Sequence, residues 1–328
     1  MAGFGQLIEM LKQDPKTIVF TEGTDARILE ASSRLLAGNF LTPILVGEED
    51  EVMKASEESG YNIRGAQIVS PKNYDRMDEM VDMFCELRKS KGVTKEEALK
   101  TLQSANYFGT MLVKMGVADA LLGGATYSTA DTVRPALQLI KTKPGNKIVS
   151  SCFIMVRPDV SEEDTVLAMG DCAINIKPTE DELVEIASEV AACAEIFGVD
   201  PKIAFLSYSS NGSGSGEDVD KMRNACKKTI EQYPQLNIVD GEIQFDAAVS
   251  PRVARTKFPT DQFAGNCNTF IFPDINAGNI GYKIAQRLGG FDAYGPILLG
   301  LNAPINDLSR GCNGQEVYSM AIITAALA

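Results

Sequence analysis

The sequence of 328 residues contains no histidine. This absence excludes Ser-His-Asp and Cys-His mechanisms, so any general base must be a carboxylate, Lys, Tyr, Cys or a water molecule. It also argues against most zinc and non-haem iron sites, because histidine is a common ligand in both. The sequence therefore implies no metal ion.

Long apolar segments and paired cysteines are absent as well. The apolar stretch Ala321–Ala328 is far shorter than the roughly 20 residues that cross a bilayer. The segment Met1–Lys12 lacks the basic region and apolar core of a signal peptide. The seven cysteines are scattered and form no Cys-x-x-Cys motif, which is typical of reduced thiols. We expect a cytoplasmic protein that does not bind membranes.

The composition is that of an ordinary globular protein, with 45% hydrophobic and 23% charged residues. The length exceeds the usual span of one core, which favours two domains. The net charge of −13 argues against binding of nucleic acid over a broad surface. An anionic substrate would need a local cluster of arginines to bind against this charge.

Short apolar segments alternate with longer amphipathic ones, which predicts an α/β protein with a largely parallel sheet. In the N-terminal part we expect a strand at Thr17–Phe20 and a helix at Asp25–Ala37, ended by Gly38. Lys141–Lys147 is the best candidate linker, and Ile148–Val156 begins a second series of strands. The last strand and helix have no partners of their own, so we expect them to return to the first domain.

The stretch Pro304–Cys312 is the most informative part of the sequence. We expect the preceding run Pro296–Leu301 to be a buried strand and Val317–Leu327 to be the closing helix. Ser309 and Arg310 would then lie between a strand end and a helix start, where unpaired N–H groups attract anions. Arg310 can grip a phosphate bidentately, and Ser309 can donate a hydrogen bond to an oxyanion.

Glu316 has two interpretations. It can act as the base that removes a proton from an incoming nucleophile. With Asn313 as N-cap it also forms a capping-box-like pair, which alone explains a glutamate at this position. The residues do not decide between the two, and one side chain can have both roles.

A second candidate phosphate site follows Gly123-Gly124, where a strand, a small loop and a helix succeed one another. Backbone N–H groups there can approach a phosphate, and Arg134 adds charge. For the hydroxyl groups alone, turn capping is the favoured interpretation. The hydroxyl groups concerned are those of Thr126, Ser128 and Thr129.

Three further features stay ambiguous. Arg88 ends a helix, where a cation often only complements the helix dipole. Lys257, before Phe258-Pro259, is equally undecided. The loop Gly212–Gly216 lacks the spacing of a dinucleotide-binding or P-loop motif, so a flexible surface loop is the first interpretation and a mobile lid the second.

Several motifs along nearly the whole chain resemble those of the phosphate acetyltransferase family. The most specific is Asn306-Asp-Leu-Ser-Arg-Gly-Cys312. The others are Glu22-Gly23 with Asp25 and Arg27, Glu86-Leu-Arg88-Lys89 with Gly92, Gly124-Ala-Thr, Thr129-Ala-Asp-Thr, Arg134-Pro135, Asp240-Gly-Glu, Gln244-Phe-Asp-Ala, Phe272-Pro-Asp and Asn276-Ala-Gly-Asn.

The resemblance implies two α/β/α domains similar to those of isocitrate and isopropylmalate dehydrogenases, with no nicotinamide bound. The first domain would comprise residues 1–147 and 300–328, and residues 148–299 would be inserted. The active site would lie in the cleft between the domains, and the protein would form a homodimer.

The resemblance also implies roles for individual residues. Arg88, Arg134 and Arg310 match the substrate arginines of the family, Ser309 its active-site serine and Lys257 a lysine of its pattern. The family base is usually an Asp, and Glu316 stands at that position here. One extra methylene moves the carboxylate by about 1 Å, and such a misplacement can cost on the order of 10²-fold in rate.

The implied activity is the reversible transfer of an acetyl group between acetyl phosphate and coenzyme A, by direct attack of the thiol. Coenzyme A, acetyl phosphate and phosphate would be substrates, and no cofactor is implied. Two alternatives remain open. One is an enzyme similar to phosphate butyryltransferases, and the other is a non-catalytic domain that senses acetyl-CoA.

Overall fold

The computed structural model describes residues 4–157 and 165–328, and the chain forms two compact units. The terminal unit comprises Leu7–Gly145 and Leu301–Ala328, and the inserted unit comprises Met1–Gln6 and Asn146–Gly300. Residues 1–3 and 158–164 of the expected domains lie outside the described residues.

The start of the chain differs from the expected division, which put it in the first domain. The ring of Phe4 packs edge-on against Phe197 and Tyr294, with centroid distances of 6.2 and 5.0 Å. These contacts group Phe4 with the inserted unit, whereas the buried Leu7 and Leu11 belong to the terminal unit. The two compact units therefore divide within the first helix, between Gln6 and Leu7.

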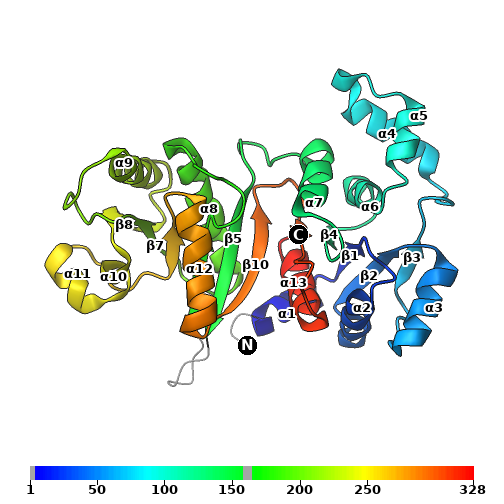
Figure 1. Cartoon of the computed structure of the whole chain (residues 1–328), viewed down its shortest axis with the longest axis horizontal. Helices are drawn as coiled ribbons and strands as arrows, with labels where there is room; N and C mark the ends of the chain where they lie inside the picture. Colours follow the sequence, from blue (N-terminus) through cyan, green and yellow to red (C-terminus); the bar gives the residue numbers. More distant parts are fainter. Residues whose placement is uncertain (1–3, 158–164) are drawn as a thin grey trace. The chain divides into compact units, whose positions relative to one another are not determined.

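The terminal unit contains a five-stranded sheet in which every pair of neighbouring strands is parallel. All four residues of its strand β4 are buried, which is typical of a strand covered on both faces. Figure 1 shows α2, α3 and α13 on one face of the sheet and α6 on the other. The strand order is β11 (Ile305–Asp307), β4 (Ala120–Gly123), β1 (Lys16–Phe20), β2 (Leu41–Val46) and β3 (Gln67–Val69).

Some helices of the terminal unit begin with side-chain caps whose residue types are visible in the sequence. Thr94 and Glu97 form a complete capping box, and Asp25 accepts a hydrogen bond from the N–H of Arg27. The helices are α1 (Phe4–Gln13, shared with the other unit), α2 (Ala26–Gly38), α3 (Glu49–Ser59), α4 (Met77–Leu87), α5 (Lys95–Thr101), α6 (Ala105–Lys114), α7 (Thr129–Pro135) and α13 (Gly314–Ala326), with short turns η1 (Lys89–Lys91) and η2 (Ala136–Ile140).

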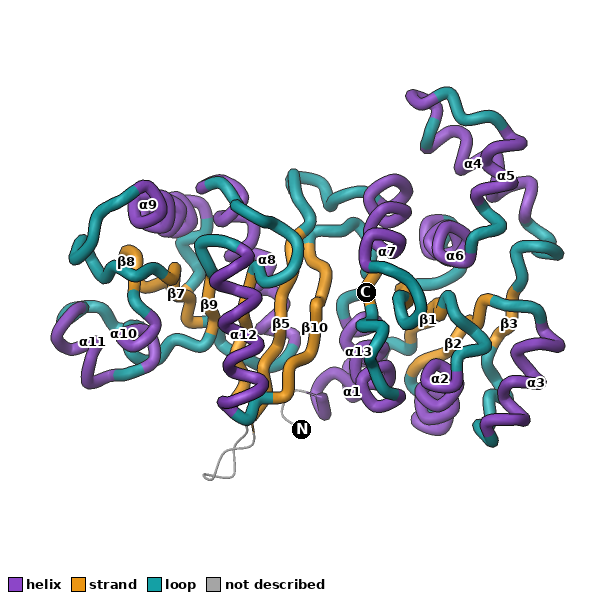
Figure 2. The backbone as a smooth tube through the Cα atoms, in the orientation of Figure 1, coloured by secondary structure: helices purple, strands orange, loops and turns teal. Residues whose placement is uncertain are grey.

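The inserted unit contains a six-stranded mixed sheet, traced in Figure 2. The strand order is β10 (Asp292–Leu299), β5 (Ser150–Arg157), β6 (Thr165–Gly170), β9 (Thr269–Ile271), β7 (Lys202–Leu206) and β8 (Asn237–Ile243). The β10–β5 and β5–β6 pairings are antiparallel and the other three are parallel. The prediction of largely parallel sheets in an α/β protein is confirmed, with β5 as the antiparallel strand.

Helices cover both faces of this sheet. Met169 packs in a buried cluster with Tyr282 of α12, whereas its neighbour Gly170 abuts Val190 of α8. Successive residues of a strand point to opposite faces, so α8 and α12 lie on opposite sides. The helices of this unit are α8 (Glu180–Ile196), α9 (Glu217–Gln232), α10 (Phe245–Val249), α11 (Pro251–Lys257) and α12 (Ile275–Gly289).

Two local predictions need correction. Helix α2 ends at Asn39, which takes the left-handed conformation at φ 54°, while Gly38 is still helical. Asparagine tolerates this conformation because its short polar side chain can bond locally. The run Pro296–Leu301 lies mostly in β10 of the inserted unit, and the strand that leads into Ser309 is the short β11. The expected position of Ser309 between a strand and a helix is nevertheless correct.

Among the residues that the structure describes, none of the helices is both long enough and apolar enough to span a membrane.

Candidate active site

The candidate site lies at the carboxyl ends of three neighbouring parallel strands in the terminal unit. Glu22 follows β1, Gly124 follows β4, and Ser309 follows β11. Because β11, β4 and β1 are adjacent and parallel, these three loops emerge from the same edge of the sheet. Ligands of open α/β sheets bind outside this edge.

The turn from Ser309 to Cys312 presents two exposed polar side chains. The N–H of Leu308 donates to the carbonyl of Gly123 at 2.7 Å, which attaches the start of the turn to the end of β4. The N–H of Cys312 then donates to the carbonyl of Ser309 at 2.9 Å and closes the turn. Ser309 and Arg310 are exposed, whereas Cys312 is buried.

The loop after β4 needs glycine at its first position. Gly124 has a φ of 99°, and a side chain there would collide with the carboxylate of Asp307. This close approach brings β11 and the β4 loop together.

The hydroxyl groups expected to bind phosphate donate to carboxylates instead. Thr126 Oγ1 donates to Glu22 at 3.3 Å, and Ser128 Oγ donates to Asp131 at 2.7 Å. Thr129 Oγ1 donates to Asp307 at 2.6 Å. A hydroxyl has one proton to donate, so in this structure these three protons are used within the protein. Phosphate binding by these residues stays a prediction.

Glu22 occupies the backbone donors of the same loop. Its Oε1 accepts hydrogen bonds from the N–H groups of Gly124 at 3.2 Å and Thr126 at 3.0 Å, and its Oε2 accepts one from Thr21 Oγ1 at 2.8 Å. Burial raises the pKa of Glu22, and the hydrogen bonds partly offset this rise. The expected cradle of free N–H groups therefore holds a carboxylate of the chain itself.

Asp307 joins helix α7 to strand β11. Its carboxylate is buried and accepts hydrogen bonds from Thr129 and Thr132, both at 2.6 Å. Burial raises its pKa, while the two hydroxyl groups act in the opposite direction. The helix that carries Arg134 is thereby attached to the strand that leads to Arg310.

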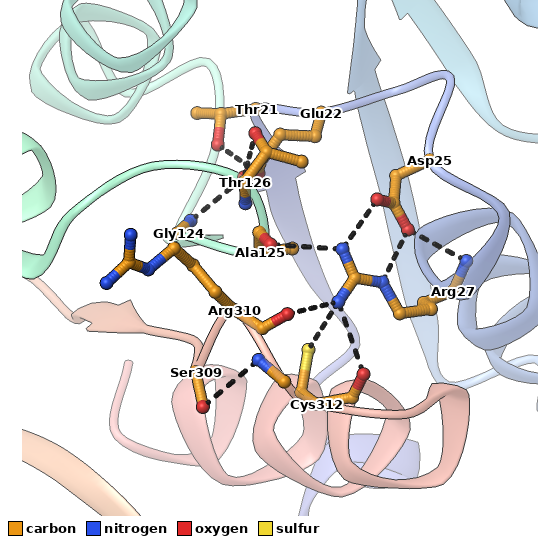
Figure 3. A network of polar contacts seen from close by, with 11 residues as sticks. Thr21, Glu22, Asp25, Arg27, Gly124, Ala125, Thr126, Ser309, Arg310 and Cys312 are labelled. Carbon is orange, nitrogen blue, oxygen red and sulfur yellow. Dashed lines mark hydrogen bonds and ion pairs between the residues drawn. The ribbon is translucent and has the colours of Figure 1, made fainter.

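Arg27 connects the loops at this edge, as Figure 3 shows. Its Nη1 donates to the carbonyls of Arg310 at 2.9 Å and Cys312 at 3.2 Å, and its Nη2 donates to the carbonyl of Ala125 at 3.0 Å. Asp25 holds the guanidinium from the other side, with contacts of 2.9 Å to Nε and 2.7 Å to Nη2. The sequence showed Arg27 only as part of a family motif and assigned it no role. These partners are distant in the chain, so the sequence could not reveal them.

Glu316 forms the predicted capping box. The N–H of Asn313 donates to Glu316 Oε2, and the N–H of Glu316 donates to Asn313 Oδ1, both at 2.9 Å. Within residues 4–157 and 165–328, the other carboxylate oxygen, Oε1, has no hydrogen-bond partner. The capping interpretation is confirmed, and the role as a base stays a prediction.

The three predicted substrate arginines lie on different elements. Arg310 is in the turn after β11, Arg134 is in α7, and Arg88 is the C-cap residue of α4. In the described part of the chain their guanidinium groups have no hydrogen-bond or ion-pair partner, so they are available to an anion. Helix α4 contacts η2, which continues α7. Convergence of the three groups on one ligand stays a prediction.

Lys257 belongs to the inserted unit, where its ammonium group has protein partners. Its Nζ donates to Gln244 Oε1 at 2.7 Å and pairs with Asp246 at 3.3 Å. In the same unit the Ser/Gly loop is bonded to the body, because Gly212 N–H donates to the buried Glu242 at 2.7 Å. Substrate binding by Lys257 stays a prediction.

A family model described as "Phosphate acetyl/butaryl transferase" matches residues 4–325. The chain therefore belongs to this family of acyltransferases, as the motifs predicted.

Individual relatives are similar over almost their whole length. The chain is 52% identical over 311 residues to the phosphate acetyltransferase of Bacillus subtilis, covering 95% of this chain and 94% of the relative. It is 48% identical over 315 residues to that of Staphylococcus epidermidis, with the same coverage. A solved phosphotransacetylase from Streptococcus pyogenes has a TM-score of 0.94 and 50% identity, covering 99% of this chain and 97% of that one.

Proposed function

We propose that this chain is a phosphate acetyltransferase that moves an acetyl group reversibly between acetyl phosphate and coenzyme A. The observation that carries the proposal is the Ser309–Arg310 turn, which presents a hydroxyl and a guanidinium without a partner among the described residues at the carboxyl edge of the sheet. The proposal is supported by the names of the relatives at 52% and 48% identity.

The proposed reaction is a direct transfer in a ternary complex, without an acyl-enzyme. The thiol of coenzyme A, with a pKa of about 8.5 like that of free cysteine, is mostly protonated at neutral pH. Glu316 takes this proton on Oε1, directly or through a water, as the sulfur attacks the acetyl carbonyl. The new bond is between sulfur and carbon, the bond between carbon and the phosphate oxygen breaks, and phosphate leaves.

The remaining residues of the site act by charge and position. Ser309 donates to the oxyanion that develops on the carbonyl oxygen, and Arg310 stabilises the departing phosphate. Arg134 and Arg88 bind phosphate groups of the substrates. Since phosphate is already a good leaving group, we attribute the larger share of the rate to positioning and fixed charge. The proposed mechanism uses no metal ion or cofactor, so we expect chelation with EDTA to leave the rate unchanged.

The experiment that tests this proposal measures thioester formation from acetyl phosphate and coenzyme A by ultraviolet absorbance. The purified protein is compared with an Arg310→Gln variant prepared in the same way. Turnover by the wild type and a loss of at least about 10²-fold in the variant support the proposal. An inactive, folded wild type that still binds acetyl-CoA would instead identify a sensing domain.

The acyl group is tested in the same assay. The family model includes both acetyl and butyryl transferases, while the relatives near 50% identity are named for acetyl transfer. We therefore propose that acetyl phosphate has a higher kcat/KM than butyryl phosphate. A preference for butyryl phosphate would contradict the acetyl assignment and retain the reaction class.

We also propose a cytoplasmic homodimer. All seven cysteines are free thiols, which suits a reducing compartment. Helix α12 has an apolar stripe of Ile280, Ile284 and Leu288, which are 58%, 54% and 85% exposed at i, i+4 and i+8. Two antiparallel copies of this stripe are self-complementary about Ile284, as a two-fold interface requires. The α12 helix has no acidic residue, which limits repulsion between two chains of net charge −13.

A further inference from the structure

The Asp25–Arg27 pair lies beside the candidate catalytic turn without contributing a free side chain to it. We propose that Arg27, oriented by Asp25, is a positioning residue that holds the Ser309–Cys312 turn in its catalytic geometry. This inference rests on the proposed function and adds a residue to which that function assigns no part.

The contacts of Arg27 join two loops that are distant in the sequence. One guanidinium donates to the carbonyl of Ala125 in the loop after β4 and to the carbonyls of Arg310 and Cys312 in the turn after β11. The donor–acceptor distances are 3.0, 2.9 and 3.2 Å. Nη1 also lies 3.7 Å from Cys312 Sγ. Both loops are thereby fixed to the start of α2, which carries Arg27.

Asp25 fixes the direction in which the guanidinium points. Its Oδ1 accepts from both the N–H and Nε of Arg27, at 2.9 Å each, and its Oδ2 accepts from Nη2 at 2.7 Å. The pair is mostly shielded from water, with exposed side-chain fractions of 27% for Arg27 and 16% for Asp25. A planar fork with five donors can serve a carboxylate and three carbonyls together, whereas a lysine ammonium has three donors and no fixed plane.

In this arrangement Arg27 binds the backbone of Arg310 and not its side chain. The carbonyl of Arg310 is bound by Arg27, while its guanidinium has no partner among the described residues. Arg27 therefore fixes the position of Arg310 without neutralising the positive charge of its guanidinium. The position of Ser309 is fixed as well, because this residue precedes Arg310 in the same closed turn.

Loss of this contact should affect the chemical step more than substrate binding. A displacement of about 1 Å in a reacting group can cost on the order of 10²-fold in rate. Arg88 and Arg134 lie outside the contacts of Arg27 and would still bind the substrate phosphates. An interaction that is needed mainly in the transition state appears in kcat rather than in KM.

The experiment compares Arg27→Ala, Arg27→Lys and Asp25→Asn with a matched control, Arg34→Ala. Arg34 is on the same helix α2 and also contacts α13, by a 2.8 Å hydrogen bond to Gln315 and by stacking on Tyr318 at 4.0 Å. Among the described residues, its hydrogen-bond, ion-pair and ring partners lie outside the Ser309–Cys312 turn. Steady-state kinetics, thermal unfolding and hydrogen exchange of the backbone amides of residues 309–312 are measured for each variant.

We expect Arg27→Ala to lower kcat by about 10–10²-fold while both KM values change by less than about threefold. Arg27→Lys should recover only part of this loss, and added guanidinium ion should raise the activity of Arg27→Ala. Asp25→Asn should have a smaller effect, because the amide oxygen still accepts from the N–H of Arg27. Exchange of the backbone amides of residues 309–312 should accelerate in Arg27→Ala and remain unchanged in Arg34→Ala.

Two results would overturn the inference. One is that kcat of Arg27→Ala stays within about twofold of wild type. The other is that Arg27→Ala and Arg34→Ala lose kcat equally and in proportion to their loss of thermal stability, which would indicate a purely structural role. If the wild type is inactive, the proposed function fails on its own, and the exchange of residues 309–312 still decides whether Arg27 holds the turn.

Discussion

Glu316, the proposed base, is a residue at which effects on helix stability and on catalysis can be separated by mutation. Its Oε2 accepts the N–H of Asn313, so it closes the first turn of α13. Glu316→Gln keeps an oxygen that can accept this hydrogen bond but removes the negative charge. Glu316→Ala removes both, and Glu316→Asp keeps the charge on a side chain one methylene shorter.

The expected stability changes follow from these contacts. Loss of a carboxylate near a helix N-terminus costs about 0.3–1 kcal/mol, which we expect for Glu316→Gln. Glu316→Ala also loses the capping hydrogen bond, for a total of about 1–2 kcal/mol. For a unit of this size, 1 kcal/mol corresponds to a Tm shift of about 2–4 °C. Both variants should therefore fold at room temperature.

The expected changes in rate are much larger. A neutral amide cannot take the thiol proton, so Glu316→Gln should lower kcat by roughly 10²–10⁴-fold. Glu316→Asp should remain about tenfold or more above Glu316→Gln, since a carboxylate is still present near the required position. Initial rates of thioester formation and scanning calorimetry on the same preparations measure both effects.

The base assignment is refuted if Glu316→Gln keeps kcat within about twofold of wild type while its Tm falls as expected. In that case the glutamate is only a helix cap, and the proton passes to water or to another group. A parallel fall of kcat in the Gln and Ala variants, despite their different stabilities, would support the base.

Three other predictions concern charge and association. Arg310→Lys should lower kcat/KM for acetyl phosphate less than Arg310→Gln does, because lysine keeps the positive charge and loses only the bidentate geometry. Equal losses of kcat/KM in the two variants would contradict this prediction. Arg27 lowers the pKa of Asp25 in the folded protein. The stabilisation of the folded state by this pair is therefore complete above the unfolded pKa of about 3.9, and it is lost as the pH falls through the lower pKa of the folded protein. Acid unfolding should thus show Asp25→Asn approaching wild-type stability at low pH, and a constant difference would refute this sign. Ile284→Glu should convert the dimer to a monomer, as measured by light scattering. The control Leu99→Glu, at an exposed leucine (45%) of another helix, should leave the dimer intact. A monomeric wild type would exclude the dimer.

Local features of the fold could be predicted because their causes lie within a few residues. The cap formed by Asn313 and Glu316, and the box formed by Thr94 and Glu97, each involve positions three apart. The alternation of apolar strands and amphipathic helices could likewise be recognised, because strands of parallel sheets are buried on both faces and are therefore apolar along their whole length. These signals were sufficient for the fold class and for the position of Ser309 between strand and helix.

Partners distant in the chain could not be predicted in this way. The hydroxyl of Thr129 donates to Asp307, and the N–H of Thr126 donates to Glu22, where the sequence suggested a bound phosphate. A free N–H or hydroxyl in a small loop is equally suited to an anionic ligand and to a carboxylate of the chain. Only the position of the other loops distinguishes the two.

The sequence alone limited which chemistry this protein can use: without histidine, any general base must be a carboxylate, Lys, Tyr, Cys or a water molecule, and Ser309 and Arg310 lie in a turn that can bind an anion. The tertiary structure decided which groups are free for that chemistry. The parallel register of β1, β4 and β11 brings Glu22, Gly124 and Ser309 to one edge. There Glu22 and Arg27 bind backbone groups of the loops, and the guanidinium of Arg310 has no partner in the part of the chain that the structure describes. The physical reason is that hydrogen bonds between loops depend on the register of the sheet, which no single segment encodes.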